Sequence, residues 1–506
     1  MRPLLPFLSL SLLAQTGPAP VELRLTEKEA IALALRQGLA PQSARNRRDA
    51  IRSGIVQEQG AFDWSVGASL SVSRLESEDA NPKTSGLNNL FFSDTRSTTY
   101  LRSFGASVEK LLFTGGTFSV SMLPTYLSQD ITQANHTFGS STTYPLAYDT
   151  QNPYGGRMAV ALTQPLLRGF GPAATEARLR AARKFSEAGD LDYQRDLVRE
   201  IALTDSLYWD FYFARQNLAD KRTTLELARK QLEEDRERVQ SGMLAPLELP
   251  AVEAAVLERE RQVLSAQNLV ETSRASLAAE ILPETATPEI LPSDEPNPVP
   301  QAFTLEEAER IALEERPELK ATRADLQARM ILETEAKNRT LPQLDATLAY
   351  LGGSATHDHV NPVLSDWSAG RYPGYYAGLQ LRVPLGNHAA RGALDRRRAE
   401  RLAADLDSRA LRQAILLEVR QSFSTLKASE KEVEALTKAL EFREKSQEAE
   451  QEKLANGLST SYFVLQRQDE LDQARTALTL ARTSYRKTLT AFLRAIGRLG
   501  AEWLTN

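Results

Sequence analysis

Few residues in this chain of 506 could do chemistry, since it has four histidines and no cysteine. His357 and His359 flank Asp358, and alternate residues of a strand share a face, so the two imidazoles could hold a metal ion. The competing interpretation is an exposed loop between strands. The sequence contains neither HExxH nor a P-loop. We therefore expect a protein that is not an enzyme, and that carries no cofactor and no catalytic residues.

Composition excludes other classes of protein. Charged residues make up 25% of the chain, but the net charge is only −5, which predicts no nucleic-acid partner. The first residues resemble a signal peptide, expected over residues 1–19: Arg2 is followed by the apolar run 4–13 and then by small residues up to Ala19. The rest of the sequence has no run of about 18 apolar residues, so we expect no membrane-spanning helix. Any insertion into a membrane would therefore use β-strands.

An internal repeat divides the rest of the chain. Leu25–Ala30 matches Phe303–Ala308 at an offset of 278, and both segments have the Thr-x-x-Glu spacing of a capping box. Further on, Ser241–Met243 matches Asn456–Leu458 at an offset of 215. The first half is thus longer by 63 residues, which lie in its middle. Six prolines in residues 283–300 predict a linker between the halves.

The later part of each half has an apolar residue at every seventh position, which predicts long helices that supercoil against a neighbour. A turn at Gly242 or Gly457 would fold each pair of helices into an antiparallel hairpin. Gln447 is the one polar member of the series. The positions are Phe211, Leu218, Leu225, Leu232 and Val239; Leu249, Val256, Val263, Val270 and Leu277; Leu426, Val433, Leu440, Gln447 and Leu454; and Val464, Leu471, Leu478, Tyr485 and Phe492.

The middle of each half alternates apolar with small or polar residues, which predicts strands with one apolar face. The first half has four such segments and the second has two. A barrel with lipid outside and water inside would show this pattern, and so would a soluble sandwich. The segments begin at Val66, Phe104, Phe118, Met158, Leu344 and Tyr375.

These patterns predict a domain organisation of two repeats joined by a linker. We expect the following parts: a first repeat over 20–282, with a helix, strands over about 64–165 and a helical hairpin over about 173–281 whose tip is at 242; a Pro-rich linker over 283–302; and a second repeat over 303–500, with a helix, strands over about 344–385 and a hairpin over about 388–496 whose tip is at 457.

This order of parts resembles the TolC family of outer-membrane efflux proteins, over almost the whole chain after the signal peptide. Two strand-to-helix passages, Gln164–Gly171 and Val383–Gly386, look like the junctions of that family. The resemblance implies an α+β membrane duct: a homotrimer whose transmembrane β-barrel, in contact with outer-membrane lipid, is continued by a periplasmic barrel of long antiparallel coiled-coil helices. It also implies a passive outer-membrane exit duct of a Gram-negative-type bacterium, serving a tripartite efflux pump or type I secretion. The cargo stays open.

The resemblance departs from the family pattern in one place. The family usually has two strands per repeat, which gives twelve in the trimer. Here an additional pair surrounds Thr114–Thr117 in the first half. That pair could enlarge the barrel or form a separate flap.

The partners that the resemblance implies are a periplasmic adaptor and an inner-membrane pump. Their docking sites would be the hairpin tips, which have small or apolar residues beside a turn glycine. The tip residues are Gly242, Met243, Leu244, Ala245, Gly457, Leu458, Ser459 and Thr460.

A gate of inward carboxylates is a further family feature. Its usual places after the second tip hold Phe463 and Gln466, so the gate does not carry over directly. Glu248 occupies the equivalent place in the first repeat, and Asp469 and Asp472 lie further along the second hairpin. These three residues are the gate candidates. We favour solvated helix-surface charges for Asp469 and Asp472.

Two non-enzymatic alternatives remain. A periplasmic coiled-coil adaptor would have one hairpin between β-domains, whereas this sequence predicts two hairpins and a duplicated strand region. A coiled-coil scaffold without membrane insertion would explain the helices but not the strands.

Overall fold

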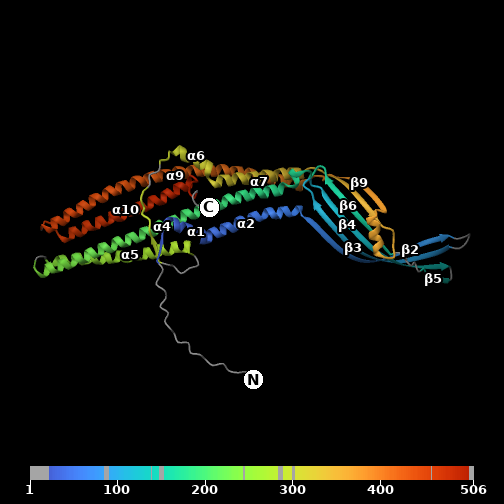
Figure 1. Ribbon diagram of the computed structural model, residues 1–506, viewed down its shortest axis with the longest axis horizontal. Helices are drawn as coiled ribbons and strands as arrows, with labels where there is room; N and C mark the ends of the chain where they lie inside the picture. The colour runs from blue at the N-terminus through green and yellow to red at the C-terminus, as the bar shows by residue number, and fades with distance from the viewer. Residues whose placement is uncertain are drawn as a thin grey trace, which may run out of the picture. The chain divides into compact units, whose positions relative to one another are not determined.

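The computed structural model describes residues 22–84, 90–137, 140–146, 153–242, 245–282, 289–298, 302–456 and 458–500 (Figure 1). The predicted signal peptide therefore lies outside the described residues. The chain forms two compact units: unit 1 comprises residues 1–49, 188–322 and 407–506, and unit 2 comprises residues 50–187 and 323–406.

Short helices open the two halves of the chain in unit 1. They are α1 (Glu27–Gln37) and α6 (Leu305–Glu315). The hydroxyl of Thr26 accepts a hydrogen bond from the backbone N–H of Glu29, and Glu29 accepts one from the backbone N–H of Thr26. Thr304 and Glu307 make the same reciprocal pair, so both predicted capping boxes are confirmed.

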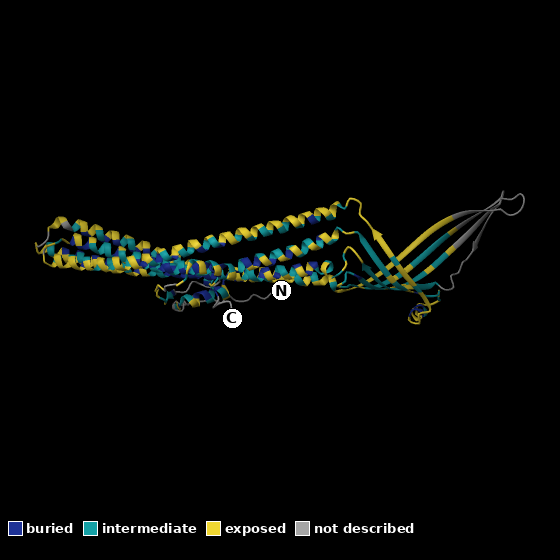
Figure 2. Ribbon diagram, turned by 90° about the horizontal axis from the view of Figure 1, so that it is seen from above, coloured by how far each residue is buried: buried dark blue, intermediate teal, exposed yellow. Residues whose placement is uncertain are grey.

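The long helices carry the heptads. They are α4 (Ala177–Gln240), α5 (Leu249–Ile281), α9 (His388–Ala455) and α10 (Ser461–Ala495). Buried residues recur along these helices between exposed ones (Figure 2). Most heptad positions are buried, Gln447 among them, as the seven-residue spacing predicts. No helix in the described part of the chain is long and apolar enough to cross a bilayer.

The two hairpins of unit 1 share a hydrophobic core. Leu465 of α10 joins the cluster that α4 and α5 build around Leu225, Val256 and Val263. A second cluster packs α1 against Tyr208 and Trp209 of α4. The apolar seam therefore does more than close each hairpin on itself, because it also packs the second hairpin against the first.

A small parallel sheet also belongs to unit 1. It pairs β1 (Glu22–Leu25) with β7 (Glu289–Pro292), in the segment that the sequence predicts as a linker. Ile290 is buried there, and Tyr208 donates a hydrogen bond to the carbonyl of Leu25 at 3.1 Å. The prolines exclude a helix but leave room for four extended residues.

Unit 2 contains one antiparallel sheet. Its path is β2 (Trp64–Thr84), β3 (Leu90–Leu111), β4 (Thr117–Thr137), β6 (Tyr154–Pro165), β8 (Gln343–Gly353) and β9 (Tyr372–Arg382), and β5 (Ser140–Leu146) pairs with β4 off this path. The additional pair of the first half is thus part of the sheet, since β4 pairs with β6 from Thr117 to Tyr126. It is not a separate flap.

Helices lead into the sheet and away from it. These are α2 (Leu39–Gln59), the 3-10 turn η1 (Gly60–Phe62), α3 (Pro172–Thr175), α7 (Pro317–Arg339) and α8 (Val360–Ser368), besides α4 and α9. At the passage from β6 to α4, Gly169 and Gly171 have φ of +83° and +84°. Only glycine adopts this conformation without strain, which explains both residues at this junction.

The sheet has two chemically different faces. One row of neighbours on it is Val66, Val108, Val120, Val160, Tyr350 and Tyr375. The adjacent row, on the opposite face, is Gly67, Ser107, Ser121, Ala159, Leu351 and Gly374. The register therefore gathers most of the apolar residues of the six strands on one face, here called the apolar face. The other face, here called the polar face, has more small and polar residues, with Leu351 among its exceptions.

Candidate duct surfaces and helical hairpin contacts

The first hairpin tip is a glycine turn. Gly242 has φ of +76°, and its N–H donates to the carbonyl of Val239 at 3.1 Å. Nothing lies within 4 Å of where a Cβ would stand on Gly242, so the backbone conformation rather than crowding requires glycine. Ala245 is exposed and extended. Met243 and Leu244 lie outside the described residues.

The second tip exposes an apolar side chain. Leu458 is 79% exposed, although its N–H is used by the carbonyl of Lys453 at 2.8 Å. The hydroxyl of Ser459 donates to Glu450, and Thr460 is the N-cap residue of α10. Gly457 lies outside the described residues. An exposed leucine held by its backbone suits contact with another helix.

The gate candidates occupy different surroundings. Glu248 ends the 3-10 turn η2 (Pro246–Glu248), and its side chain lies outside what the structure describes. Asp469 and Asp472 point from α10 toward the first hairpin. Asp472 is buried, so the prediction of a solvated surface charge is wrong for this residue. Asp469 keeps half of its side chain exposed but is ion-paired.

Charged and polar contacts join α10 to α4 and α5 within unit 1. Arg259 donates through Nη2 to Oδ1 of Asp469 at 2.7 Å and to the carbonyl of Leu465 at 3.3 Å. Lys221 forms an ion pair with Asp472. Thr224 donates to Oδ1 of the same carboxylate at 3.1 Å. These contacts are called the inter-hairpin cluster below.

A third contact of the same kind lies nearer the tips. The hydroxyl of Ser461 donates to Oδ1 of Asp235 at 2.8 Å, and Gln231 also donates to Asp235 at 3.0 Å. The other carboxylate oxygen of Asp235 is buried and has no hydrogen-bond partner among the described residues. Burial of a carboxylate costs desolvation free energy, and the hydrogen bonds from Ser461 and Gln231 to its Oδ1 offset part of that cost.

Burial sets the electrostatics of the inter-hairpin cluster. The side chain of Arg259 is 3% exposed and that of Lys221 is 15% exposed. Burial raises the pKa of Asp469, although the neighbouring Arg259 acts in the opposite direction. Buried ion pairs add little net stability, but removing one partner is costly because it leaves an unpaired charge. The cluster therefore fixes one arrangement of the two hairpins.

The sequence holds a signal for this cluster that the heptad series above does not include. A second seam in α4 runs through Ala214, Lys221, Ala228 and Asp235, again seven apart, and Val252, Arg259 and Ala266 continue it in α5. The four apolar members are buried. A charged residue in such a seam must meet a partner from another helix.

The histidine pair does not converge on a metal site. Nε2 of His357 lies 2.7 Å from Oδ2 of the buried Asp366, which also accepts hydrogen bonds from the backbone of Ala355 and from Arg371. These contacts hold the pKa of Asp366 below its usual range, with His357 as the largest cause. His359 is exposed and lies 3.5 Å from Asp358. His357 therefore helps fix the β8–β9 connection, and its side chain is not free in a loop.

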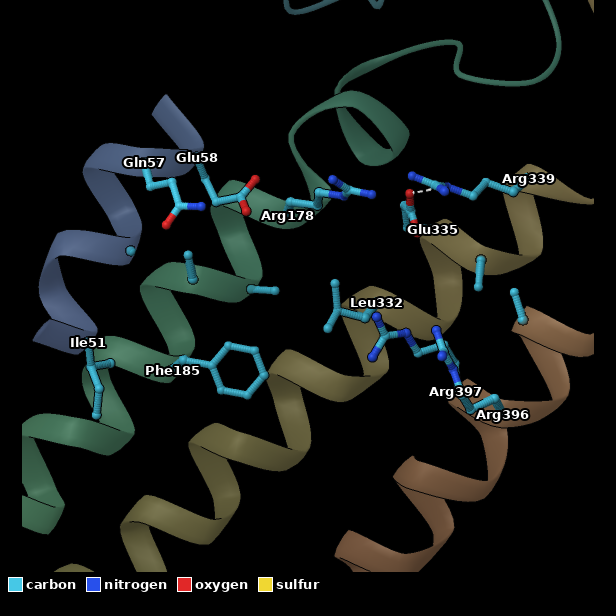
Figure 3. Close-up of a pocket in the computed structure, with 15 residues that line it drawn as sticks. Ile51, Gln57, Glu58, Arg178, Phe185, Leu332, Glu335, Arg339, Arg396 and Arg397 are labelled. Atoms are coloured by element: carbon cyan, nitrogen blue, oxygen red, sulfur yellow. Dashed lines mark hydrogen bonds and ion pairs between the residues drawn. The ribbon is translucent and has the colours of Figure 1, made fainter. Parts of the chain in front are cut away.

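Four helices of unit 2 line a cavity of about 450 Å³. Figure 3 shows α2, α4, α7 and α9 side by side, with Arg178, Arg339, Arg396 and Arg397 around the cavity. Glu335 pairs with Arg339, and Arg397 pairs with Glu400. Among the described residues Arg178 has no ion-pair partner. The lining is thus net positive.

A second cavity connects these helices to the sheet. It shares Arg178, Glu335 and Arg339 with the first, and it adds Thr117 and Thr163 from the strands. Both threonines belong to the polar face of the sheet, as their register shows. The polar face and the cavity-lined side of the four helices therefore form one continuous surface, here called the inner surface.

Comparison with known proteins shows which family and which solved structures the chain resembles. Residues 310–498 match the family of outer membrane efflux proteins. The matched residues lie in the second half of the chain. The description of that family names the outer membrane and efflux, which agrees with the resemblance over the matched part of the chain. No curated protein sequence matches the chain.

Solved structures show that the same fold extends over both halves of this chain. CusC is 12% identical, with a TM-score of 0.64, over 96% of this chain and 95% of that one. The CmeC outer membrane channel of Campylobacter jejuni is 14% identical, with a TM-score of 0.62, over 93% and 85%. The open-state MtrE outer membrane channel of Neisseria gonorrhoeae is 14% identical, with a TM-score of 0.61, over 93% and 88%. At these identities the likeness establishes the fold.

Proposed function

We propose that three copies of this chain form the outer-membrane exit duct of a tripartite efflux pump or a type I secretion system. The sheet lies in the outer membrane, and the helical hairpins extend into the periplasm. Cargo arrives from an inner-membrane pump through a periplasmic adaptor and leaves passively. The duct is a conduit and has no catalytic part.

The continuous inner surface is the observation that supports this proposal most directly. A polar sheet face that leads into a charged helical surface gives water and solutes one path. The apolar face on the other side of the same strands suits lipid. A soluble scaffold has no use for an apolar face spread over six strands, since exposed apolar area of that extent favours association.

The geometry of the hairpin tips supports the proposal that a periplasmic adaptor docks there. Exposed Leu458 and the tight turn at Gly242 allow close approach of another helix pair, and each tip is anchored by its own backbone hydrogen bonds. Docking at these tips is thus proposed for all eight residues named from the sequence, including the three outside the described residues.

The test is reconstitution of the purified protein in planar lipid bilayers. We expect stable ion channels from a detergent-extracted trimer, and recovery of the protein in the outer-membrane fraction of cells. A protein that is released in soluble form by mild lysis and gives no channels would support the scaffold or adaptor alternative instead.

A matched pair of variants tests whether the inner surface lines the pore. Arg178 lines both cavities, whereas Arg180 stands two residues further along α4 and lines neither of the two. A charge inside a pore attracts ions of opposite sign, and one on the outside does so far less. We expect Arg178→Glu to shift ion selectivity toward cations and Arg180→Glu to leave it unchanged. Equal effects would place the pore elsewhere.

A further inference from the structure

The additional hairpin β3–β4 continues the apolar face without a break. Leu70 pairs with Phe104, Val108 pairs with Val120, and Val120 pairs with Val160 of β6. On the opposite face Ser107 pairs with Ser121. A flap that folds away from the membrane would not need to repeat the apolar and polar rows of its neighbours in register.

Aromatic and basic residues bound the apolar face at one end, and they do so across the additional hairpin. The guanidinium of Arg102 lies 5.6 Å from the ring centre of Tyr126, and Arg74 lies at the same distance from Tyr100. The rings of Tyr126 and Tyr154 lie 5.1 Å apart. Such girdles mark the level of the lipid headgroups in outer-membrane barrels.

The other end of the apolar face has a similar boundary. Nζ of Lys110 lies 4.8 Å from the ring centre of Trp64. Arg102 and Lys110 belong to the same strand and the same face, eight residues apart. At about 3.3 Å per residue and a tilt of about 40°, they enclose an apolar band about 20 Å high. That height is close to the band of roughly 25 Å that lipid requires.

Both outer strands of the sheet lack a partner strand on one side within the described residues. Apolar side chains of both strands are exposed on the apolar face: Leu70 of β2 by 78% and Leu379 of β9 by 73%. Lipid does not tolerate unpaired backbone edges. With six antiparallel strands in the path, β2 and β9 run in opposite directions, so β9 of one copy can extend the antiparallel pattern with β2 of another.

We infer that three copies close a barrel of eighteen strands, six from each, through pairing of β9 with β2 of the next copy. This inference rests on the proposed duct. The partner for each edge is a second copy of this chain. Eighteen strands at a spacing of about 4.8 Å and a tilt of about 40° give a diameter near 36 Å, against roughly 24 Å for twelve.

The register within the sheet limits how β9 and β2 pair. Successive partners lead from Trp64 through Lys110, Phe118, Leu162 and Leu348 to Ala377. The offset of Ala377 from Trp64 of the next copy must be even to keep apolar residues on one face. An offset of six residues between copies gives a strand tilt of about 35°, and an offset of eight gives about 43°. Both lie within the known range of roughly 35–45°.

These two offsets name the residues that should meet. Ala377 lies opposite Leu70 at an offset of six and opposite Val72 at an offset of eight. The offset of six also places Leu379 opposite Ala68, apolar on apolar. An offset in the other direction would place Ala377 beyond the start of β2, opposite residues of α2, where no strand is available.

Cysteine pairs test the closure directly, because the chain has no cysteine of its own. We expect either Leu70→Cys with Ala377→Cys, or Val72→Cys with Ala377→Cys, to form disulfides between copies in membranes, seen as a reducible trimer band in denaturing gels. The single variants are the controls and give no band. Absence of bands from both pairs, in a protein that still forms channels, would overturn this pairing of edges.

Adjacent residues of β3 test the strand count. We expect Val108→Cys to be protected from a membrane-impermeant maleimide by lipid, and Ser107→Cys to be labelled from the lumen of the same trimer. Equal labelling of both variants in a channel-forming trimer would place β3 outside the wall and overturn the eighteen-stranded barrel. If the unsubstituted protein forms no channels, the proposed duct fails instead.

Discussion

Lys221 of α4 and Asp472 of α10 form an ion pair in unit 1, although 251 positions of sequence separate them. The Asp472 side chain is 7% exposed, and Thr224 donates to its second oxygen. The pair therefore ties the second helical hairpin to the first in a place where water cannot replace either partner.

Removal of one member of this pair should be costly. Asp472→Ala leaves the ammonium of Lys221 buried without its partner, and we expect a loss of about 3–5 kcal/mol in the stability of the hairpin contact. The melting temperature should fall and channel conductance should rise as the hairpins separate. The double variant Lys221→Met, Asp472→Leu should recover much of the stability. An unchanged melting curve for Asp472→Ala would show that the pair is not formed.

Glu200 of α4 makes the stability of unit 1 depend on pH. It is 4% exposed, and its burial, with the neighbouring carboxyl of Glu280, raises its pKa from 4.5 to about 8. The folded protein then keeps a proton that the unfolded chain releases between these values, so stability falls as the pH rises through this window. Burial of Asp205, with a pKa raised to about 7, acts in the same direction.

We therefore expect the melting temperature to be a few degrees lower at pH 9 than at pH 6. Glu200→Gln is uncharged at both values and should weaken this dependence, with most of the gain at pH 9. Thermal melts of the two proteins at both pH values make the comparison. If the melting temperature of Glu200→Gln depends on pH as strongly as that of the unsubstituted protein, other groups cause the dependence.

The heptad seam should not tolerate charge. Leu225 is 8% exposed in the core shared by the hairpins, and Leu440 packs against the core of the second half. Aspartate at either place would bury an unpaired carboxylate and cost several kcal/mol, roughly 2–5. Glu226→Asp, one residue away on the exposed side, is the control and should be nearly silent. Unchanged melting temperatures for both leucine variants would show that the heptad assignment is wrong.

The hairpin tips should matter for export without mattering for assembly. We expect Gly457→Asp and Leu458→Asp to leave the trimer in the membrane and to abolish export and crosslinking to the adaptor, because a bulky charge blocks close helix approach. Gly242→Asp and Leu244→Asp should act likewise but more mildly. Crosslinking to the adaptor in whole cells is the measurement. Normal export by Gly457→Asp, with the adaptor still crosslinked, would remove docking from the tip.

Glu248 follows the first tip, where threefold symmetry would bring three carboxylates around the narrow end of the duct. Three like charges close together attract cations and repel anions. We expect Glu248→Gln to lower cation preference in planar bilayers and to leave export largely intact. Unchanged selectivity would place this side chain on the outer, solvated face of the helices.

Periodicity in the sequence by itself determined the elements of this protein. Seven-residue spacing predicts the long helices because the side of a helix that meets a neighbour recurs at that interval, and Leu225 and Val263 are buried as it requires. Alternation predicts the strands for the corresponding reason with a period of two. The capping residues Thr26 and Thr304 fix where short helices begin, since their bonds reach only three residues along the chain.

Only the tertiary structure decided which distant segments meet. The place of β3 and β4 inside the sheet depends on pairing of β4 with β6, which local alternation leaves open. The β1–β7 pair and the contacts of Asp472 likewise join segments more than 200 residues apart. A charged residue in a heptad seam indicates that it needs a partner from another helix. The sequence pattern does not identify that partner, because periodicity shows which face of an element is buried and not which element packs against it.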